Sequence, residues 1–301
     1  MQIFKHQTPL LVLPAVLVAL SLFSLFFWGL KPGIDLSGGS LLQVSYPDGR
    51  PPVEQVRALV AELDLGEVRV QPTGTDGYIL RQRDLSTDEK AHLEAVLSGL
   101  GSVHEDQYTS IGPTIGSELL HKAYLAIAAV VVCIILFIAF AFRQVSEPVS
   151  SWKYGIVAII TLIHDILIPA GLFAYLGAVR GAEVDALFIV GLLTILGISI
   201  NDTIVVFDRI RENLRLNAEK RRKELFEETV GRSIMQTLSR SINTSLTVII
   251  MLLALFVWGP ASTKDFALTL IVGMVAGTYS SILLASPFLV LWEKWSKKGK
   301  K

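Results

Sequence analysis

Long apolar runs alternate with polar segments along this chain, and six of the runs are long enough to cross a lipid bilayer. The runs cover 10–30, 123–142, 154–177, 191–213, 240–258 and 266–292. A membrane helix needs about 20 predominantly apolar residues to span the hydrocarbon core. The pattern therefore predicts a polytopic α-helical membrane protein with six transmembrane helices.

The first run has an alternative interpretation as a secretory signal peptide. It is longer than a typical signal-peptide core, and no small-residue cleavage site follows it. Lys31, Pro32 and Gly33 come next instead. We therefore interpret residues 1–30 as a cytoplasmic N-terminus followed by the first membrane helix.

Residues 31–121 form a polar insert in which short apolar groups follow strand-like and helix-like spacing. Strands are predicted over 40–46, 67–71, 78–83 and 103–109, and helices over 52–63 and 86–100. Ser86 is followed three residues later by Glu89, which is the pattern of a helix capping box. The order βαββαβ is typical of a ferredoxin-like unit, so we expect a small periplasmic α+β domain. In the alternative, some of these strands pair only with a partner chain.

The remaining chain divides at a second polar segment, residues 214–239. Helices two to four occupy 122–213, and helices five and six with a basic cytoplasmic tail occupy 240–301. Apolar residues recur mostly four apart over 225–238, which indicates an amphipathic helix on the cytoplasmic membrane surface. A solvated linker helix is equally compatible with this pattern.

The distribution of basic residues predicts how the chain is oriented. Lysine and arginine are concentrated in 209–223 and 294–301, whereas the loops near Arg180 and Lys264 carry one positive charge each. Short loops rich in Lys and Arg remain on the cytoplasmic side. We therefore expect a multi-pass protein of the bacterial inner membrane, with both termini cytoplasmic and the 31–121 domain in the periplasm.

Composition supports the membrane class and excludes several others. The 301 residues are 51% hydrophobic and only 18% charged, with a mean hydropathy of +0.54, which is too apolar for a soluble domain of this length. A net charge of zero gives no indication of nucleic-acid binding. The single cysteine, Cys133, excludes an internal disulfide. We find no metal-ligand spacing, no phosphate-binding glycine loop and no nucleophile–base–acid set, so neither a cofactor nor an enzymatic activity is expected.

The fourth apolar run carries Asn201, Asp202 and Thr203 side by side, about two helical turns inside its polar end. A carboxylate at the centre of a membrane helix costs roughly 2.5–3.5 kcal/mol on insertion scales. Such residues usually face a protein interior or a water cavity and take part in function. In the alternative interpretation, the three residues only hydrogen-bond to a neighbouring helix.

Three other apolar runs also contain residues with a candidate role. His164 and Asp165 lie near the middle of the third run, either as functional ionisable groups or as a structural hydrogen-bonded unit. Arg240 opens the fifth run, where it either reaches the lipid phosphates or pairs with Asp202. Gly273 and Gly277 in the sixth run give the small-xxx-small spacing of close helix packing.

Four of these motifs closely resemble the SecF proteins of the SecD/SecF family, within the resistance-nodulation-division superfamily. They are GIDLSGGS at 33–40, the His164-Asp165 pair, SINDTIVVFDRIREN at 199–213 and RSINTS at 240–245. The resemblance covers the whole chain. It implies a SecD partner with six further helices, association with the SecYEG channel, and use of the proton-motive force in late-stage translocation and periplasmic release of unfolded polypeptides. YajC and YidC are further candidate partners.

The resemblance also assigns roles to residues. It implies that Asp202 is a proton-relay carboxylate, that Arg240 is the cation near it, and that Asn201 and Thr203 are their polar neighbours. The resemblance also implies that His164 and Asp165 belong to the same proton relay. Two rival functions remain open, namely a proton-coupled exporter of small molecules or lipids and an assembly subunit that does not transduce energy.

Overall fold

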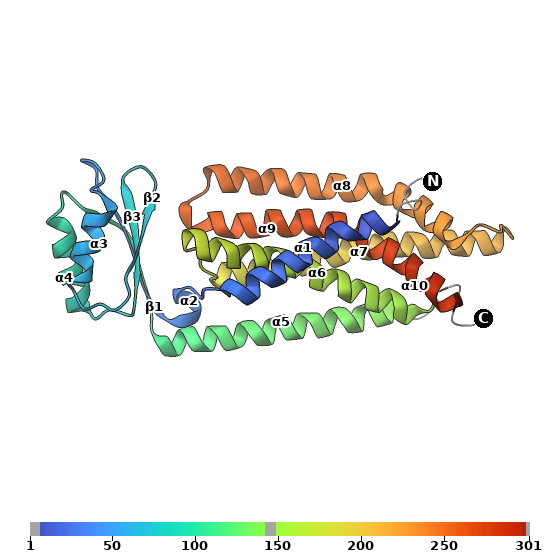
Figure 1. Ribbon diagram of the computed structural model, residues 1–301, viewed down its shortest axis with the longest axis horizontal. Helices are drawn as coiled ribbons and strands as arrows, with labels where there is room; N and C mark the ends of the chain where they lie inside the picture. The colour runs from blue at the N-terminus through green and yellow to red at the C-terminus, as the bar shows by residue number, and fades with distance from the viewer. Residues whose placement is uncertain (1–6, 142–148, 299–301) are drawn as a thin grey trace. The chain divides into compact units, whose positions relative to one another are not determined.

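A computed structural model describes residues 7–141 and 149–298. The chain forms two compact units (Figure 1). We call Met1–Lys31, Ile127–Ala182 and Leu187–Lys301 the helical unit, and Pro32–Ala126 with Glu183–Ala186 the sheet unit. Residues 1–6, 142–148 and the last three residues of the basic tail lie outside the described residues.

Six helical spans among the described residues are long and apolar enough to cross a membrane, which confirms the prediction of a polytopic membrane protein. Their bounds are α1 Gln7–Trp28, α5 Pro113–Ala141, α6 Ser151–Arg180, α7 Ala186–Glu219, α8 Phe226–Trp258, and α9 Ala261–Ser280 continued by a π-helix Ser281–Ala285 and α10 Ser286–Lys298. Short turns connect α6 to α7, α7 to α8 and α8 to α9.

The two helices α7 and α8 are longer than expected, and the prediction of a separate helix over 214–239 is wrong. Helix α7 extends to Glu219 and α8 begins at Phe226, so only a short turn separates them. Asn213 donates a hydrogen bond to Ser233 at 2.8 Å, and Asn217 donates one to Thr229 at 3.1 Å. The polar residues of this segment therefore join two antiparallel helices rather than marking the outer face of one.

Burial is uneven among the helices of the helical unit. In α6, in α7 and in the span formed by α9 and α10, about half of the residues in the most apolar 18-residue stretch are buried. The corresponding stretches of α1, α5 and α8 are largely exposed. The apolar core of this unit includes Tyr154, Leu196, Phe207, Ile210 and Leu289. Helices α6, α7 and α9 are thus the central elements, and polar side chains on them are shielded from the surroundings.

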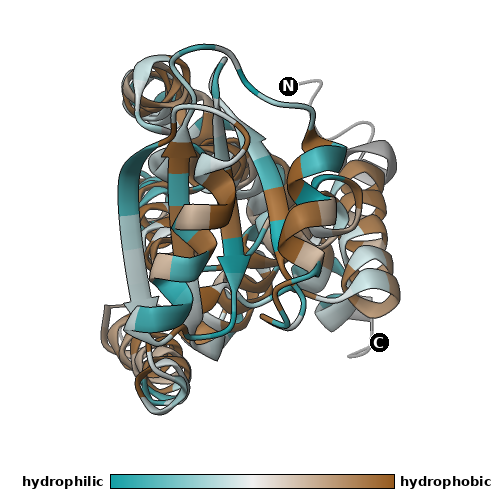
Figure 2. Ribbon diagram, turned by 90° about the vertical axis from the view of Figure 1, so that its left-hand side faces the viewer, coloured by the Kyte–Doolittle hydropathy of each residue, from teal (hydrophilic) through white to brown (hydrophobic). Residues whose placement is uncertain are grey.

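The sheet unit confirms the predicted ferredoxin-like order. Its elements are β1 Gly39–Ser45, α3 Val53–Ala61, β2 Arg69–Thr73, β3 Gly77–Gln82, α4 Thr87–Ser98 and β4 His104–Ile111. The strands lie in the order β2-β3-β1-β4, and every neighbouring pair is antiparallel. Helices α3 and α4 cover one face of the sheet (Figure 2). Their apolar residues pack on Leu42, Val44 and Leu80 to form the core of the unit.

A short helix, α2 (Ile34–Ser37), precedes β1 and was not predicted. It ends at Gly38 and Gly39, whose φ angles of +79° and +139° suit glycine. A Cβ at Gly38 would lie 2.6 Å from the Cα of Pro113, and one at Gly39 would lie 2.6 Å from the carbonyl oxygen of Gln82. The two glycines are therefore needed for the chain to pass between α5 and β3.

Candidate functional site

Asp202 lies on α7 inside the helical unit, and its residue is only 7% exposed. The charged and polar groups within electrostatic reach of its carboxylate are Arg240 and Ser241, both on α8. Arg240 is exposed, and within the described residues it forms no ion pair at 4.0 Å or less. The structure thus brings Arg240 near Asp202 without closing a direct salt bridge.

The two neighbours of Asp202 in the chain have different surroundings. Thr203 is buried, and its hydroxyl lies 3.1 Å from the hydroxyl of Ser281 on the π-helix. Asn201 is exposed. Because successive residues of an α-helix point about 100° apart, the three polar residues cannot share one partner. Asn201 therefore does not join the buried residues predicted to accompany it.

His164 and Asp165 on α6 belong to a buried group of hydrogen-bonded side chains, which we call the polar cluster. Asp165 is fully buried and accepts hydrogen bonds from His164 Nδ1 at 2.8 Å, from Ser280 at 3.0 Å and from Ser199. His164 Nε2 lies 2.7 Å from the hydroxyl of Tyr279. The cluster joins α6 to α7 through Ser199 and to α9 through Tyr279 and Ser280.

Each hydrogen bond of the polar cluster can pair one donor with one acceptor. With Asp165 ionised, both serine hydroxyls and the Nδ1–H of His164 donate to the carboxylate. Nε2 of a neutral His164 then accepts a hydrogen bond from the Tyr279 hydroxyl. A histidine between a phenol and a carboxylate is an arrangement that can accept and release a proton.

The sequence analysis identified Arg240 as a neighbour of Asp202 but not the hydroxyl groups that contact Asp165, His164 and Thr203. Ser199, Tyr279, Ser280 and Ser281 were missed, although 278–281 is a run of polar residues within an apolar span. The π-helix Ser281–Ala285 begins at the last residue of this run. A π-helical turn is rare and frequently occurs at functional sites, so it marks the same position of the sixth span.

The predicted packing glycines lie where α9 approaches α7. A Cβ at Gly273 would lie 2.1 Å from the Cδ1 of Ile195, and one at Gly277 would lie 3.1 Å from the Cβ of Ser199. The absence of side chains at these two positions lets the helices approach closely. This approach also places Ser199 of α7 and Ser280 of α9 on the same carboxylate of Asp165.

Two family models match the chain. One, described as protein export membrane protein SecD/SecF, C-terminal, matches residues 92–295, and the other, described as the SecD/SecF GG motif, matches residues 23–46. A protein translocase subunit SecF of Thermobaculum terrenum is 44% identical over 282 residues, which is 89% of this chain and 86% of that protein. A protein translocase subunit SecF from Synechocystis is 34% identical to this chain, and the match covers 98% of this chain and 95% of that protein.

A solved structure has the same fold. The crystal structure of SecDF from Thermus thermophilus, described as a translocon-associated membrane protein, matches 98% of this chain with a TM-score of 0.84 and 32% identity. The match covers 39% of that longer chain. The chain studied here therefore corresponds to about two fifths of the length of that protein.

Proposed function

The chain belongs to the SecD/SecF family of protein-export membrane proteins, and we propose that it is a Sec translocase subunit that works with a SecD partner. The two proteins together use the proton-motive force to promote late-stage translocation and periplasmic release of secreted polypeptides. SecD supplies the second six-helix bundle, and the complex associates with the SecYEG channel, with YajC and YidC as further partners. Both termini of this chain are cytoplasmic in the bacterial inner membrane.

One observation carries this proposal, namely the burial of Asp202 in a membrane helix with Arg240 in electrostatic reach, while the described residues show no ion pair between the two. A carboxylate at this depth is costly unless its charge is balanced or removed. Protonation of Asp202 removes the charge and ends its attraction to Arg240. The balance between two arrangements of α7 and α8 therefore depends on the protonation of one side chain.

The energy of one proton is sufficient for such a change. A proton that crosses a membrane held at about 100 mV gains roughly 2.3 kcal/mol from the electrical potential alone. A free-energy difference of this size shifts an equilibrium between two conformations that differ by a few kcal/mol. The polar cluster around Asp165 extends the proton-handling groups from α7 to α6 and α9, with His164 as the group that exchanges protons.

The exporter of small molecules or lipids remains as a second candidate because of one observation. An apolar groove of about 430 Å³ lies against α8 and α9, within the size range of small-molecule sites. Ile242, Leu246 and Val275 are among its lining residues. Tyr279 of the polar cluster also lines it, which would connect a bound apolar molecule to the same proton-handling groups.

The proposal predicts that Asp202→Asn abolishes the response of protein export to a proton gradient. We would measure export in inverted membrane vesicles that contain this chain and SecD, with ATP held constant and with or without a gradient. Asp208→Asn is the matched control, because Asp208 is an exposed carboxylate on the same helix. We expect the gradient to accelerate late-stage export in the wild type and in Asp208→Asn but not in Asp202→Asn.

The same vesicles distinguish the rival functions. An equal gradient response in the wild type and in Asp202→Asn would contradict a relay role for Asp202. If Asp202→Asn prevents recovery of the complex with SecD, while the complexes that survive keep the gradient response, the chain is an assembly subunit. Gradient-driven efflux of a lipophilic dye, with polypeptide export unaffected, would favour the exporter.

A further inference from the structure

Two arginines of the sheet unit face each other across neighbouring strands. Arg69 on β2 lies opposite Arg81 on β3 in the antiparallel register. Val70 and Leu80, the next residues on each strand, belong to the apolar core, so the arginines lie on the other face of the sheet. Like charges directly opposite one another destabilise a sheet. This position therefore requires an anionic partner.

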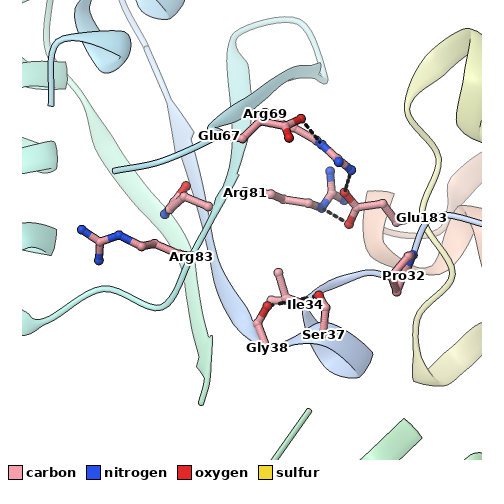
Figure 3. A pocket seen from close by; sticks show the side chains of 10 residues that line it. Pro32, Ile34, Ser37, Gly38, Glu67, Arg69, Arg81, Arg83 and Glu183 are labelled. Carbon is pink, nitrogen blue, oxygen red and sulfur yellow. Dashed lines mark hydrogen bonds and ion pairs between the residues drawn. The ribbon is translucent and has the colours of Figure 1, made fainter. Parts of the chain in front are cut away.

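The partner is Glu183, which comes from the loop between α6 and α7 and groups with the sheet unit. Arg69 Nη1 lies 3.0 Å from Glu183 Oε1, and Arg81 Nε lies 3.4 Å from Oε2 (Figure 3). The Glu183 side chain is only 10% exposed, whereas Glu67, a second partner of Arg69 at 3.0 Å, is 78% exposed. One shielded carboxylate thus contacts both facing arginines through charge-assisted contacts, and Glu67 supplies a second negative charge beside Arg69.

The backbone holds the same loop at two further points. The N–H of Gly33 donates to the carbonyl of Val184 at 2.8 Å, next to a parallel bridge between Pro32 and Val184. The side chain of Asp35 accepts a hydrogen bond from the N–H of Ala186 at 3.1 Å. The segment 183–186 is therefore bound to the rest of the sheet unit by the side chain of Glu183 and by the main chain of Val184 and Ala186.

The two ends of this loop continue directly into α6 and α7. Helix α6 carries His164 and Asp165, and α7 carries Asp202. We propose that Glu183, held by Arg69 and Arg81, is the coupling residue that transmits movement of these two helices to the β2–β3 hairpin of the sheet unit. This inference rests on the proposed function, because it specifies how a protonation change in the helices reaches the sheet unit.

Glu183→Gln in the complete complex with SecD tests this coupling. The amide keeps the size of the side chain but removes the charge that balances the two arginines. We expect the gradient-dependent acceleration of export to fall roughly five-fold, the lower end of typical coupling between sites. The ATP-driven rate without a gradient stays unchanged. Glu67→Gln is the matched control, since it removes the other carboxylate partner of Arg69 without touching the loop, and it keeps the wild-type response.

A charge exchange adds a test by rescue. Glu183→Arg places a third positive charge at the site and removes the gradient response, and the combination with Arg69→Glu and Arg81→Glu restores it. A purely structural role for Glu183 would instead lower complex recovery in every variant and leave the gradient response of the recovered complexes unchanged. Wild-type gradient response in Glu183→Gln overturns the inference and leaves the proposed function in place, whereas no gradient response in the wild type overturns the proposed function itself.

If the Glu183 variants do not assemble with SecD, a measurement that leaves Glu183 unchanged tests the same coupling. A fluorophore attached to Thr75→Cys, in the turn between β2 and β3, reports on the hairpin in a Cys133→Ala background. We expect its emission to change when a proton gradient is imposed and to stay constant in Asp202→Asn. Constant emission in a complex that exports protein in a gradient-dependent way overturns the inference.

Discussion

The two buried carboxylates of the helical unit differ in how completely their hydrogen-bonding capacity is used. Asp165 accepts from His164 and from two serines, so its position is determined by three donors. Asp202 has Arg240 within electrostatic reach but no direct ion pair among the described residues. Hydrogen bonds donated to an ionised carboxylate favour its charged form, so a carboxylate with fewer donors takes up a proton more readily. Asp202 is therefore the better candidate for the switching group, and Asp165 for a fixed member of the relay.

A pH-dependent contact at the residue scale lies in the sheet unit. Hydrogen bonds with Arg83, and with Ser86 in the confirmed capping box, lower the pKa of Glu89 to about 2. A carboxylate with a lowered folded-state pKa stabilises the fold above its unfolded pKa of about 4.3, and this stabilisation is lost as the pH falls through the folded value. We expect the hydrogen-exchange protection of α4, corrected for intrinsic rates, to decline between about pH 5 and pH 2.

The decline in α4 protection should be smaller in Glu89→Gln, which lacks the ionisable group. Asp48→Asn, at an exposed turn residue outside α4, is the control and should behave as the wild type. A decline of the same size in Glu89→Gln and in the wild type would contradict the assignment.

At the scale of the elements, α7 and α9 depend on each other for the placement of the polar cluster. Ser199 on α7 and Ser280 on α9 reach the same carboxylate only because Gly273 and Gly277 allow close approach. The π-helix that follows Ser280 changes the direction in which the next residues point. Ser281 thereby faces Thr203 while Ser280 faces Asp165, so one turn of the sixth span serves two polar positions.

Adding a methyl group at Gly273 tests this packing. Gly273→Ala places a Cβ against the buried Ile195, and overpacking of this kind typically destabilises a protein by about 1–3 kcal/mol. Gly197→Ala is the control, because no atom lies within 4 Å of its added Cβ. We expect a lower thermal unfolding midpoint for Gly273→Ala in the purified complex, and the packing role would be wrong if both variants unfolded at the same temperature.

At the scale of the whole molecule, the proposed function requires the sheet unit and the α7–α8 turn to lie on opposite sides of the membrane. The chain crosses the bilayer an even number of times between its termini if all six apolar spans are inserted. The basic residues around the α7–α8 turn then determine which side is cytoplasmic. We therefore expect the sheet unit, which follows the first span, on the other side.

Single cysteines test this orientation. In a Cys133→Ala background, Thr75→Cys reports on the sheet unit and Lys223→Cys reports on the α7–α8 turn, since both positions are exposed. A membrane-impermeant maleimide added to spheroplasts should label Thr75→Cys and leave Lys223→Cys unlabelled. Inverted vesicles should give the opposite result. Labelling of Lys223→Cys from the outside would contradict the positive-inside assignment.

The amino-acid sequence alone determined the features that depend on local composition and period. Six spans follow from the length of the apolar runs, and the βαββαβ order follows from strand and helix spacing in the insert. Asp202 and the pair His164-Asp165 could be selected as candidate site residues because membrane depth makes an ionisable side chain unusual. None of these inferences required knowledge of which helices are neighbours.

Only the tertiary structure decided which distant residues meet. Tyr279 and His164 are separated by 115 positions, and their contact depends on how α6 and α9 are rotated and packed. Glu183 lies in a short loop that also contains Asp185, with no local pattern to indicate that it meets Arg69 and Arg81. Helix rotation and strand register are set by the packing of the whole chain, so residue spacing along the sequence cannot specify these partners.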